Sequence, residues 1–336
     1  MTLAEFNGFY EIRRYKMIFE KQIIEMYKGM AYTRCDDNGT AYYFSADDFS
    51  GLNREAYRFK SSMGHDLSGY IYSYESPKSG KLVVFDHGFG GGHRSYMKEI
   101  EKLCAHGFTV FAYEHTGCME SGGENPNGMA QSLCDLNDAL TAIKSDARFA
   151  GVELYVMGHS WGGFSTLNIS ALHPEVSRIV VLSGFVSVPM LVGSYFGGIM
   201  KPYRKPIMEL EKAANPRFVA CNAVESLSGS KAKALLIYSD NDKMCRKKPH
   251  YDALAAGLEG KENIKLVLVE GKGHNPNYTK DAVKYLGEYL AAKAKLAKKK
   301  QLETAQQKAD FVAGYDWWAM TMQDMDVWNR IFEFIE

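Results

Sequence analysis

Short runs of apolar residues, many of them β-branched or aromatic, recur through the middle of the chain. Each run is brief and almost wholly apolar, which is typical of strands that are buried on both faces of a sheet. Six such strands are predicted, over residues 82–85, 109–113, 154–157, 179–182, 234–238 and 264–269. Upstream of them, residues 57–60 and 67–74 flank a turn that contains Gly64, and this pattern predicts a β-hairpin.

Helical patterns separate these strands, over residues 96–106, 129–148, 164–172, 249–258 and 279–297. Strands that alternate with helices call for right-handed crossovers and a mostly parallel sheet with helices on both faces. We therefore expect an α/β core made of residues 56–182 and 231–297.

Three segments lie outside this alternation. Residues 1–55 form an N-terminal extension, and residues 183–230 form an insertion that leaves the sheet at a strand end, where open α/β sheets place their ligands. Residues 298–336 form a C-terminal segment that carries three tryptophans and several methionines and is too apolar to stay in water. We expect it to dock on the same chain or to support a homodimer.

Composition narrows the class of protein. Hydrophobic residues make up 46% of the 336 residues and charged residues 24%, as in ordinary globular proteins. The 40 basic and 40 acidic residues cancel, so the chain has no net field to hold a nucleic acid. No apolar run approaches the roughly 20 residues of a membrane helix, and charged residues interrupt the N-terminus up to Gln22, which argues against a signal peptide.

The cysteines and histidines give no sign of a metal or cofactor. The six cysteines form no CxxC pair, which favours reduced thiols and a cytoplasmic location. The nine histidines form no HExxH motif, and His87 and His93 have no ligand partners nearby in the sequence. We expect neither a metal nor a cofactor.

The strongest chemical signal is the segment Gly158-His159-Ser160-Trp161-Gly162, which lies between a predicted strand and a predicted helix. A serine on so tight a turn needs small neighbours and presents its hydroxyl above the sheet at a helix N-terminus. This context, rather than the bare GxSxG spacing, marks Ser160 as a nucleophile. The alternative is a glycine-rich turn with an idle serine.

A serine hydroxyl needs a positioned base, and the base needs an orienting carboxylate. His274 follows the strand over residues 264–269, and Asp242 follows the strand over residues 234–238. Asp240 is the rival acid, but Asp242 lies farther past the strand end and is preferred. His274 could also serve only as a helix cap.

The segment His87-Gly88-Phe89-Gly90-Gly91-Gly92 follows the strand over residues 82–85. Acyl transfer needs backbone N–H groups aimed at the developing oxyanion, and the amides of Phe89 and Trp161 are the natural pair. Phosphate binding by these glycines is disfavoured, because neither GxxxxGK[ST] nor GxGxxG spacing is present.

With these motifs the chain resembles the α/β-hydrolase superfamily, and within it the serine-aminopeptidase-like and carboxylesterase-like branch that carries a cap. The resemblance covers about residues 57–182 and 231–296 and includes residues 114–123, EHTGCMESGG, which are similar to the family's DxxGxGxSxG segment. This copy departs from that segment at Glu114 and Cys118, neither of which we expect to touch the chemistry. The resemblance implies an eight-stranded, mostly parallel sheet with a small helical cap, and the serine disfavours the dehalogenases and epoxide hydrolases that use aspartate there.

These observations predict a serine hydrolase that cleaves small or medium carboxylic esters through an acyl-enzyme. An aminopeptidase-like amidase, a thioesterase and a non-catalytic ligand-binding protein are the alternatives, since fold alone does not fix function. The cap is expected to wall an apolar acyl pocket rather than to form only its own small core. The predicted pocket residues are His159, Phe185, Met190, Leu191, Tyr195 and Phe196, with Met200 beside them. The acidic residues of the insertion, Glu209, Glu211 and Glu225, lie in its polar second half and are not expected to face the site.

Overall fold

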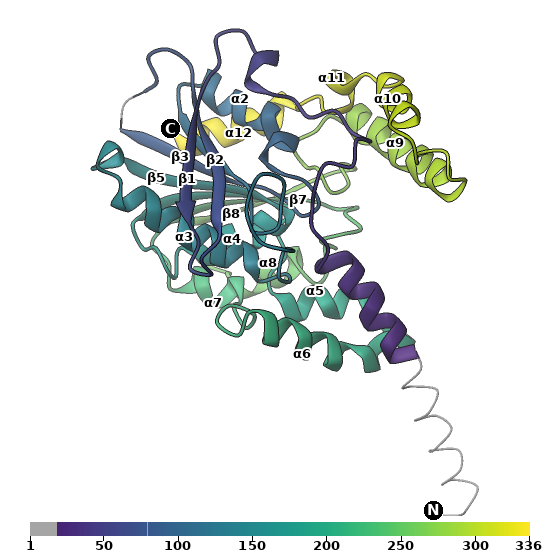
Figure 1. The fold of residues 1–336 in the computed structure, drawn as a ribbon. Helices are drawn as coiled ribbons and strands as arrows, with labels where there is room; N and C mark the ends of the chain where they lie inside the picture. Colours follow the sequence, from purple (N-terminus) through teal and green to yellow (C-terminus); the bar gives the residue numbers. More distant parts are fainter. Residues whose placement is uncertain (1–18, 79) are drawn as a thin grey trace, which may run out of the picture.

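The computed structural model describes residues 19–78 and 80–336 (Figure 1). The prediction that no signal peptide is present rests mainly on residues 1–18, which lie outside the described residues. Within the described ranges, no helix combines the length and the apolar character needed to cross a membrane.

One eight-stranded sheet forms the centre of the molecule, in the order β1-β2-β4-β3-β5-β6-β7-β8. The β1–β2 and β2–β4 pairs are antiparallel, and every other pair is parallel. The strands are β1 Asn53–Lys60, β2 Asp66–Ser73, β3 Lys81–Asp86, β4 Thr109–Tyr113, β5 Glu153–His159, β6 Val176–Leu182, β7 Lys233–Ser239 and β8 Ile264–Val269. The predicted hairpin and the mostly parallel eight-stranded sheet are confirmed.

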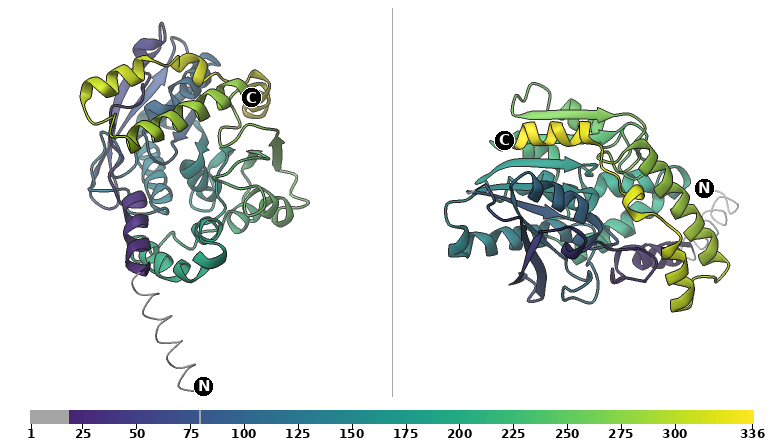
Figure 2. Two further views of the ribbon diagram at one scale, coloured as in Figure 1. Left: turned by 90° about the vertical axis from the view of Figure 1, so that its right-hand side faces the viewer. Right: turned by 90° about the horizontal axis from the view of Figure 1, so that it is seen from above.

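Helices cover both faces of the sheet, because side chains along each strand alternate between two apolar cores. On β3, Leu82 and Val84 face the core under α3 (Gln131–Ser145), α4 (Ser160–Ile169) and α8 (Tyr251–Gly257). Val83 and Phe85 face the opposite core, under α2 (Met97–Ala105) and α12 (Met325–Ile335). The two layers of helices are visible in Figure 2.

The insertion after β6 forms a small helical cap at one end of the sheet (Figure 1). Its helices are α5 Val188–Tyr195, η4 Gly198–Tyr203, α6 Arg204–Ala214 and α7 Ala223–Ser228. A helix covering residues 19–31 lies beside α5 and α6 and contributes Tyr27 and Ala31 to the same core. The N-terminal extension therefore packs against the cap.

The C-terminal segment docks on its own chain. α9 (Lys280–Lys298), α10 (Ala305–Ala313) and α11 (Trp317–Met320) enclose a small core around Tyr289. α12 then returns to the sheet and buries Trp328 in the core of that face. The apolar face of α12 is thus covered within one chain, and a homodimer through this segment stays a prediction.

Two sequence-based expectations differ from the structure. The strand β8 is not buried on both faces as expected, because it is the edge strand and exposes Leu268. The helix expected to begin at Phe164 begins at Ser160, because the tight turn itself supplies the first turn of α4. Neither difference moves a candidate site residue.

Trp328→Ala is expected to lower the free energy of unfolding by about 3–5 kcal/mol, the usual cost of truncating a large buried aromatic side chain. Trp328 is 0% exposed, and its indole N–H donates to Gln323 Oε1 at 2.8 Å. Urea unfolding measures the effect, with Arg330→Ala on the exposed side of the same helix as the control. Equal midpoints for the two variants would show that α12 adds little to the core.

Candidate active site

Ser160 occupies a strained turn between β5 and α4. Its φ of 56° lies in the left-handed region that side chains rarely adopt. The flanking glycines are required by close packing, since a Cβ on Gly158 would lie 2.3 Å from Gly162 O, and one on Gly162 would lie 2.1 Å from Asp86 O. The turn therefore holds the Ser160 hydroxyl at the carboxyl edge of the sheet.

Ser160, His274 and Asp242 form a continuous hydrogen-bonded chain. His274 Nε2 lies 2.8 Å from Ser160 Oγ, and His274 Nδ1 lies 2.8 Å from Asp242 Oδ2. With Nδ1 protonated and donating to the carboxylate, Nε2 is free to accept the serine proton. The three predicted residues are brought together from three separate loops in a geometry suited to nucleophilic catalysis.

Asp242, and not Asp240, faces the histidine. Asp242 Oδ1 accepts from the amides of Met244 at 2.7 Å and Cys245 at 3.0 Å, which leaves Oδ2 for His274. Burial alone would raise the pKa of Asp242, but the hydrogen bond and charge of His274 outweigh it and lower that pKa. Asp240 is exposed, and its Oδ1 accepts a hydrogen bond from the amide of Gly271 at 2.8 Å. It therefore contacts the backbone of the loop that carries His274 rather than the histidine ring.

His159 holds the histidine loop in place. Its Nε2 lies 2.8 Å from the carbonyl oxygen of His274, and its Nδ1 lies 2.8 Å from Tyr96 Oη. Tyr96 Oη in turn accepts from the amide of Gly88 at 3.1 Å. Burial lowers the pKa of His159 to about 3, so the ring is neutral and can donate from one nitrogen and accept at the other. This relay joins the glycine-rich loop to the loop of His274.

The two amides predicted to hold an oxyanion belong to residues beside the serine. Trp161 is the second residue of α4, where helix N–H groups have no partner within the helix. The Phe89 and Trp161 rings pack edge to face, with 4.9 Å between their centroids, and both residues border the same cavity as Ser160. Their role as oxyanion donors stays a prediction.

A cavity of about 390 Å³ opens onto Ser160. Four of the predicted pocket residues line it, namely Phe185, Leu191, Tyr195 and Phe196, and Met200 does so as well. Among the residues that the structure describes, no lining residue is charged, and Ser160 carries the only aliphatic hydroxyl of the lining. The cavity is therefore suited to an uncharged, apolar group.

Two predicted pocket residues do not line this cavity. His159 is absent from the lining, and both of its ring nitrogens are engaged by Tyr96 and by the His274 carbonyl. Met190 instead packs against the core on that side of the sheet. Glu211 also departs from expectation, since it is buried rather than part of a polar surface, although it does not line the cavity.

Sequence reasoning missed seven of the lining residues, and most of them lie outside the cap. They are Met26, Tyr27, Met30, Met129, Val192, Met244 and Cys245, of which only Val192 belongs to the cap. Ile23, Tyr27 and Ala31 recur at helical spacing, so a helix there was predictable. Its position beside the cavity depends on distant partners and was not.

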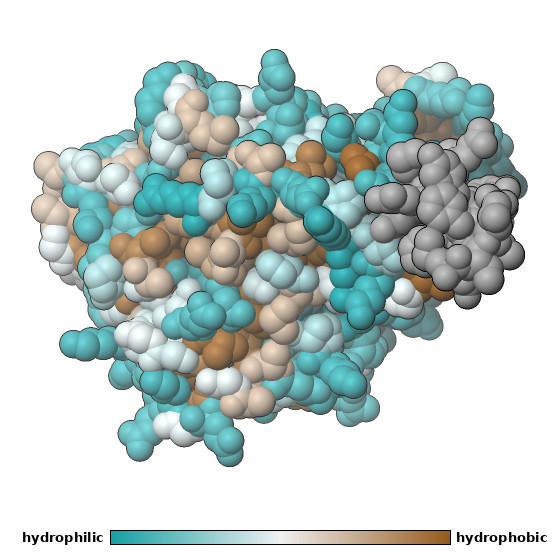
Figure 3. All heavy atoms as spheres, turned by 90° about the horizontal axis from the view of Figure 1, so that it is seen from below, coloured by the Kyte–Doolittle hydropathy of each residue, from teal (hydrophilic) through white to brown (hydrophobic). Residues whose placement is uncertain are grey.

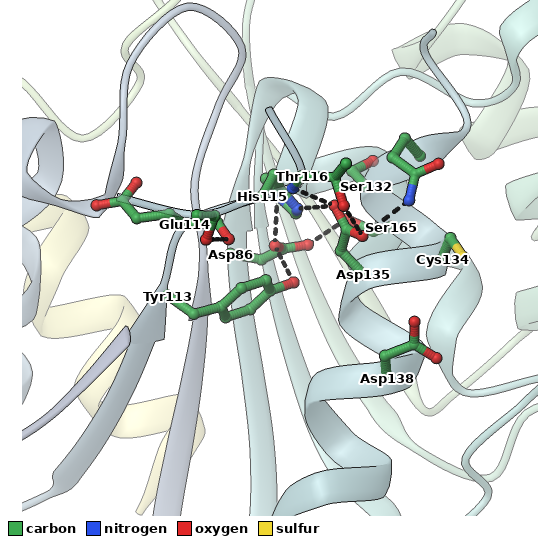
Figure 4. Close-up of polar contacts among 12 residues, drawn as sticks. Asp86, Tyr113, Glu114, His115, Thr116, Ser132, Cys134, Asp135, Asp138 and Ser165 are labelled. Carbon is green, nitrogen blue, oxygen red and sulfur yellow. Dashed lines mark hydrogen bonds and ion pairs between the residues drawn. The ribbon is translucent and has the colours of Figure 1, made fainter. Parts of the chain in front are cut away.

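A buried charged network around His115 links Asp86 at the end of β3 to Asp135 of α3 and Ser165 of α4 (Figure 4). His115 Nδ1 lies 3.3 Å from Asp135 Oδ2, and its Nε2 lies 2.8 Å from Asp86 Oδ1 in a contact that is ionic rather than well aligned for a hydrogen bond. Burial alone would lower the pKa of His115, but the two carboxylates raise it to about 10. The centroid of the protonated ring lies 4.6 Å from that of the Trp161 ring, so His115 supports the residue next to Ser160.

Glu114, the residue before His115, fixes the glycine-rich loop through contacts of its own. It pairs with His93, with 2.5 Å between Glu114 Oε1 and His93 Nδ1, and His93 Nε2 lies 2.7 Å from Tyr72 Oη. A Cβ on Gly92 would lie 2.0 Å from Glu114 Oε2, so the close approach requires glycine. Glu114 does not contact Ser160, Asp242 or His274 through any described hydrogen bond or ion pair, yet it holds the loop that carries Phe89.

His115→Gln is expected to destabilise the protein by about 3–5 kcal/mol near pH 6, because it leaves two buried carboxylates without their cation. The folded pKa of about 10 exceeds the unfolded value near 6.5, so this contribution is complete below pH 6.5 and is lost as the pH rises through 10. Urea unfolding at pH 6 and pH 9 tests it. The difference between wild type and His115→Gln should shrink at pH 9, and a constant difference would contradict a charged His115.

One group of side chains in residues 19–78 and 80–336 offers three metal-ligating atoms within 4.8 Å of one another, namely Asp242, Cys245 and His274. Burial raises the pKa of the Cys245 thiol well above its usual value, which opposes the thiolate form that metals bind. Asp242 and His274 already pair with each other. The three residues therefore suit a hydrogen-bonded Asp242–His274 pair beside a neutral thiol better than a metal centre.

Comparison with known proteins places this geometry in a family. Residues 77–268 match the family model of the S33 serine aminopeptidases. The chain is 24% identical over 140 residues to RutD of Agrobacterium fabrum, whose name describes it as a putative carbamate hydrolase. That alignment covers 41% of this chain and 51% of RutD. It is 27% identical over 116 residues to Cutinase 2 of Thermobifida cellulosilytica, covering 34% of this chain and 44% of the cutinase. The match thus spans about half, or less, of these relatives.

Among solved structures, the esterase Pf2001 of Pyrococcus furiosus superimposes with a TM-score of 0.57 at 18% identity. The alignment covers 80% of this chain and 99% of the esterase, which shows a shared fold. The family model spans more than half of the chain and includes the glycine-rich loop, Ser160 and Asp242. The chain therefore belongs to the S33 serine aminopeptidase family of α/β hydrolases.

Proposed function

We propose that this protein is a serine esterase that cleaves uncharged carboxylic esters through an acyl-enzyme. The observation that carries the proposal is the apolar cavity beside Ser160, which no charged residue within 19–78 and 80–336 lines. An aminopeptidase must bind a free ammonium group, and burying that charge without an anionic partner would be costly. The names of the cutinase and esterase relatives agree with ester cleavage.

Acylation would begin with proton transfer to the histidine. His274 Nε2 takes the proton of Ser160 Oγ as the oxygen attacks the acyl carbon, and the amides of Phe89 and Trp161 hold the resulting oxyanion. The carbon–oxygen bond to the alcohol then breaks, and His274 returns the proton to the departing alkoxide. Asp242 stabilises the histidine cation throughout.

Deacylation would repeat these steps with water. His274 removes a proton from water, the hydroxide oxygen attacks the acyl carbon, and the bond to Ser160 Oγ breaks as the histidine returns its proton to that oxygen. The products are a carboxylic acid and the regenerated serine. An amidase or thioesterase would use the same residues with a different leaving group.

The acyl-chain profile tests this proposal. We compare kcat/KM across a series of acetyl to decanoyl esters of one alcohol. Each added methylene should raise kcat/KM, through a gain of up to roughly 1 kcal/mol in transition-state binding free energy, until the cavity is full. Alanyl and prolyl anilides should be poorer substrates than these esters. A preference for an anilide would favour the amidase alternative, and no turnover of any ester would favour a ligand-binding protein.

A further inference from the structure

The helix covering residues 19–31 borders the cavity that opens onto Ser160. Met26, Tyr27 and Met30 line the cavity and share one side of this helix, because Met30 lies four residues after Met26 and three after Tyr27. Met26 is 60% exposed and Met30 55%, so these two side chains lie where the cavity meets solvent. The helix precedes the part of the chain that matches the family model, residues 77–268.

A buried carboxylate fastens this helix to the cap. Glu211 of α6 is 1% exposed, and its Oε1 accepts from Tyr27 Oη at 2.7 Å and from Tyr32 Oη at 3.0 Å. Its Oε2 accepts from the amide of Met129 at 2.8 Å. We call this arrangement the Glu211 clasp. It joins α6 to two segments that border the cavity, because Tyr27 and Met129 are themselves lining residues.

Burying the Glu211 carboxylate costs desolvation free energy, and the surrounding hydrogen-bond donors must offset that cost. Within the described residues, Glu211 forms no ion pair with a basic side chain and bonds only to neutral donors, and burial raises its pKa. A buried carboxylate without a cation needs several donors, and the clasp supplies three. Gly128, at φ +84°, makes room for it, since a Cβ there would lie 2.7 Å from Tyr32 Oη and 2.8 Å from Glu211 Oε2.

The surface on the cap side is largely hydrophilic but contains exposed patches of apolar residues (Figure 3). Tyr195 and Met244 are exposed lining residues like Met26 and Met30, so the cavity has an apolar rim. A short acyl group on Ser160 would leave this rim in water. A longer chain would cover it and gain hydrophobic free energy, and methionine side chains adapt well to a flexible alkyl chain.

We propose that the helix covering residues 19–31 is the outer wall of the acyl site and makes the enzyme selective for acyl chains long enough to reach Met26 and Met30. The Glu211 clasp positions that wall. This inference rests on the proposed esterase function and deepens it, because it assigns chain-length selectivity to a segment outside both the catalytic core and the cap.

The first test changes the wall. The ratio of interest is kcat/KM for the decanoyl ester divided by kcat/KM for the acetyl ester. In the Met26→Ser/Met30→Ser double variant this ratio should fall by about tenfold relative to wild type, because most of the apolar surface that helix 19–31 offers at the cavity rim is lost. Met325→Ser, at another exposed methionine, on α12 and away from the cavity, is the matched control and should leave the ratio unchanged. An unchanged ratio in the double variant would overturn the inference.

The second test uses the wild-type chain and does not depend on a variant folding. Ser160 is labelled with either a methyl or a decyl fluorophosphonate, and amide hydrogen exchange is followed over residues 19–31. The decyl adduct should slow exchange there at least severalfold more than the methyl adduct. Equal exchange in two fully labelled samples would contradict the inference and leave the esterase proposal intact, whereas failure of both probes to label Ser160 would contradict the proposed function.

The clasp has its own variant. Tyr27→Phe keeps the ring in the cavity wall but removes the donor to Glu211, so it should shift the decanoyl to acetyl ratio in the same direction as the double variant and raise exchange over residues 19–31. Tyr42→Phe, which removes an exposed hydroxyl bonded to Asp48, is the control. A change in stability without a change in this ratio would mean that the clasp is only structural.

Discussion

Ser160→Ala is expected to lower kcat for ester hydrolysis by about a millionfold, the loss seen when a triad nucleophile is removed. The hydroxyl is the atom that must form the acyl-enzyme, and no other described group is placed at His274 Nε2. Serine and alanine both carry a Cβ, so either residue at position 160 experiences the same backbone strain at this positive φ. The substitution should therefore leave the fold intact.

Steady-state kinetics measure the loss, with thermal unfolding as the check on folding. Ser145→Ala, an exposed serine at the end of α3, is the matched control and should retain full activity. A Ser160→Ala enzyme with more than a small fraction of wild-type kcat would show that another group attacks the ester.

Asp242→Asn is expected to lower kcat by about ten-thousandfold, while Asp240→Asn should have a mild effect. The side-chain amide introduced by Asp242→Asn could donate toward His274 Nδ1, which would favour the tautomer whose Nε2 is protonated and cannot accept the serine proton. Asp240 accepts one backbone N–H from Gly271, and an asparagine oxygen can still accept it.

The two substitutions preserve side-chain size, so the comparison reports on which carboxylate orients the histidine. Measuring kcat for both variants with the same ester gives the answer directly. A larger loss in Asp240→Asn would mean that the hydrogen bond between His274 and Asp242 is not the one used in catalysis.

The order of strands and helices was predictable because it depends on local pattern. The apolar runs around Val84 and Val180 are typical of strands buried in a sheet, and the glycines around Ser160 require a sharp turn into a helix. Fold class and superfamily followed from these features and are confirmed.

The parts that could not be predicted depend on partners distant in the sequence. Nothing near Glu211 indicates that two tyrosines more than 170 residues away would bury it. His159 directly precedes the serine, which favours a place in the pocket lining. Its ring instead bonds to Tyr96 and to the His274 carbonyl and does not line the cavity. The regular apolar spacing of α12 predicts burial, yet only the fold shows which surface covers it.

Stoichiometric labelling with a fluorophosphonate, followed by mapping of the modified peptide, tests the central claim most directly. The reagent reacts with a serine only where a base activates the hydroxyl and donors stabilise the resulting oxyanion-like adduct. We expect one label per chain, on Ser160 of the peptide that contains GHSWGG, and none in Ser160→Ala. No labelling of the folded wild-type protein, or labelling that persists at another residue in Ser160→Ala, would contradict the account.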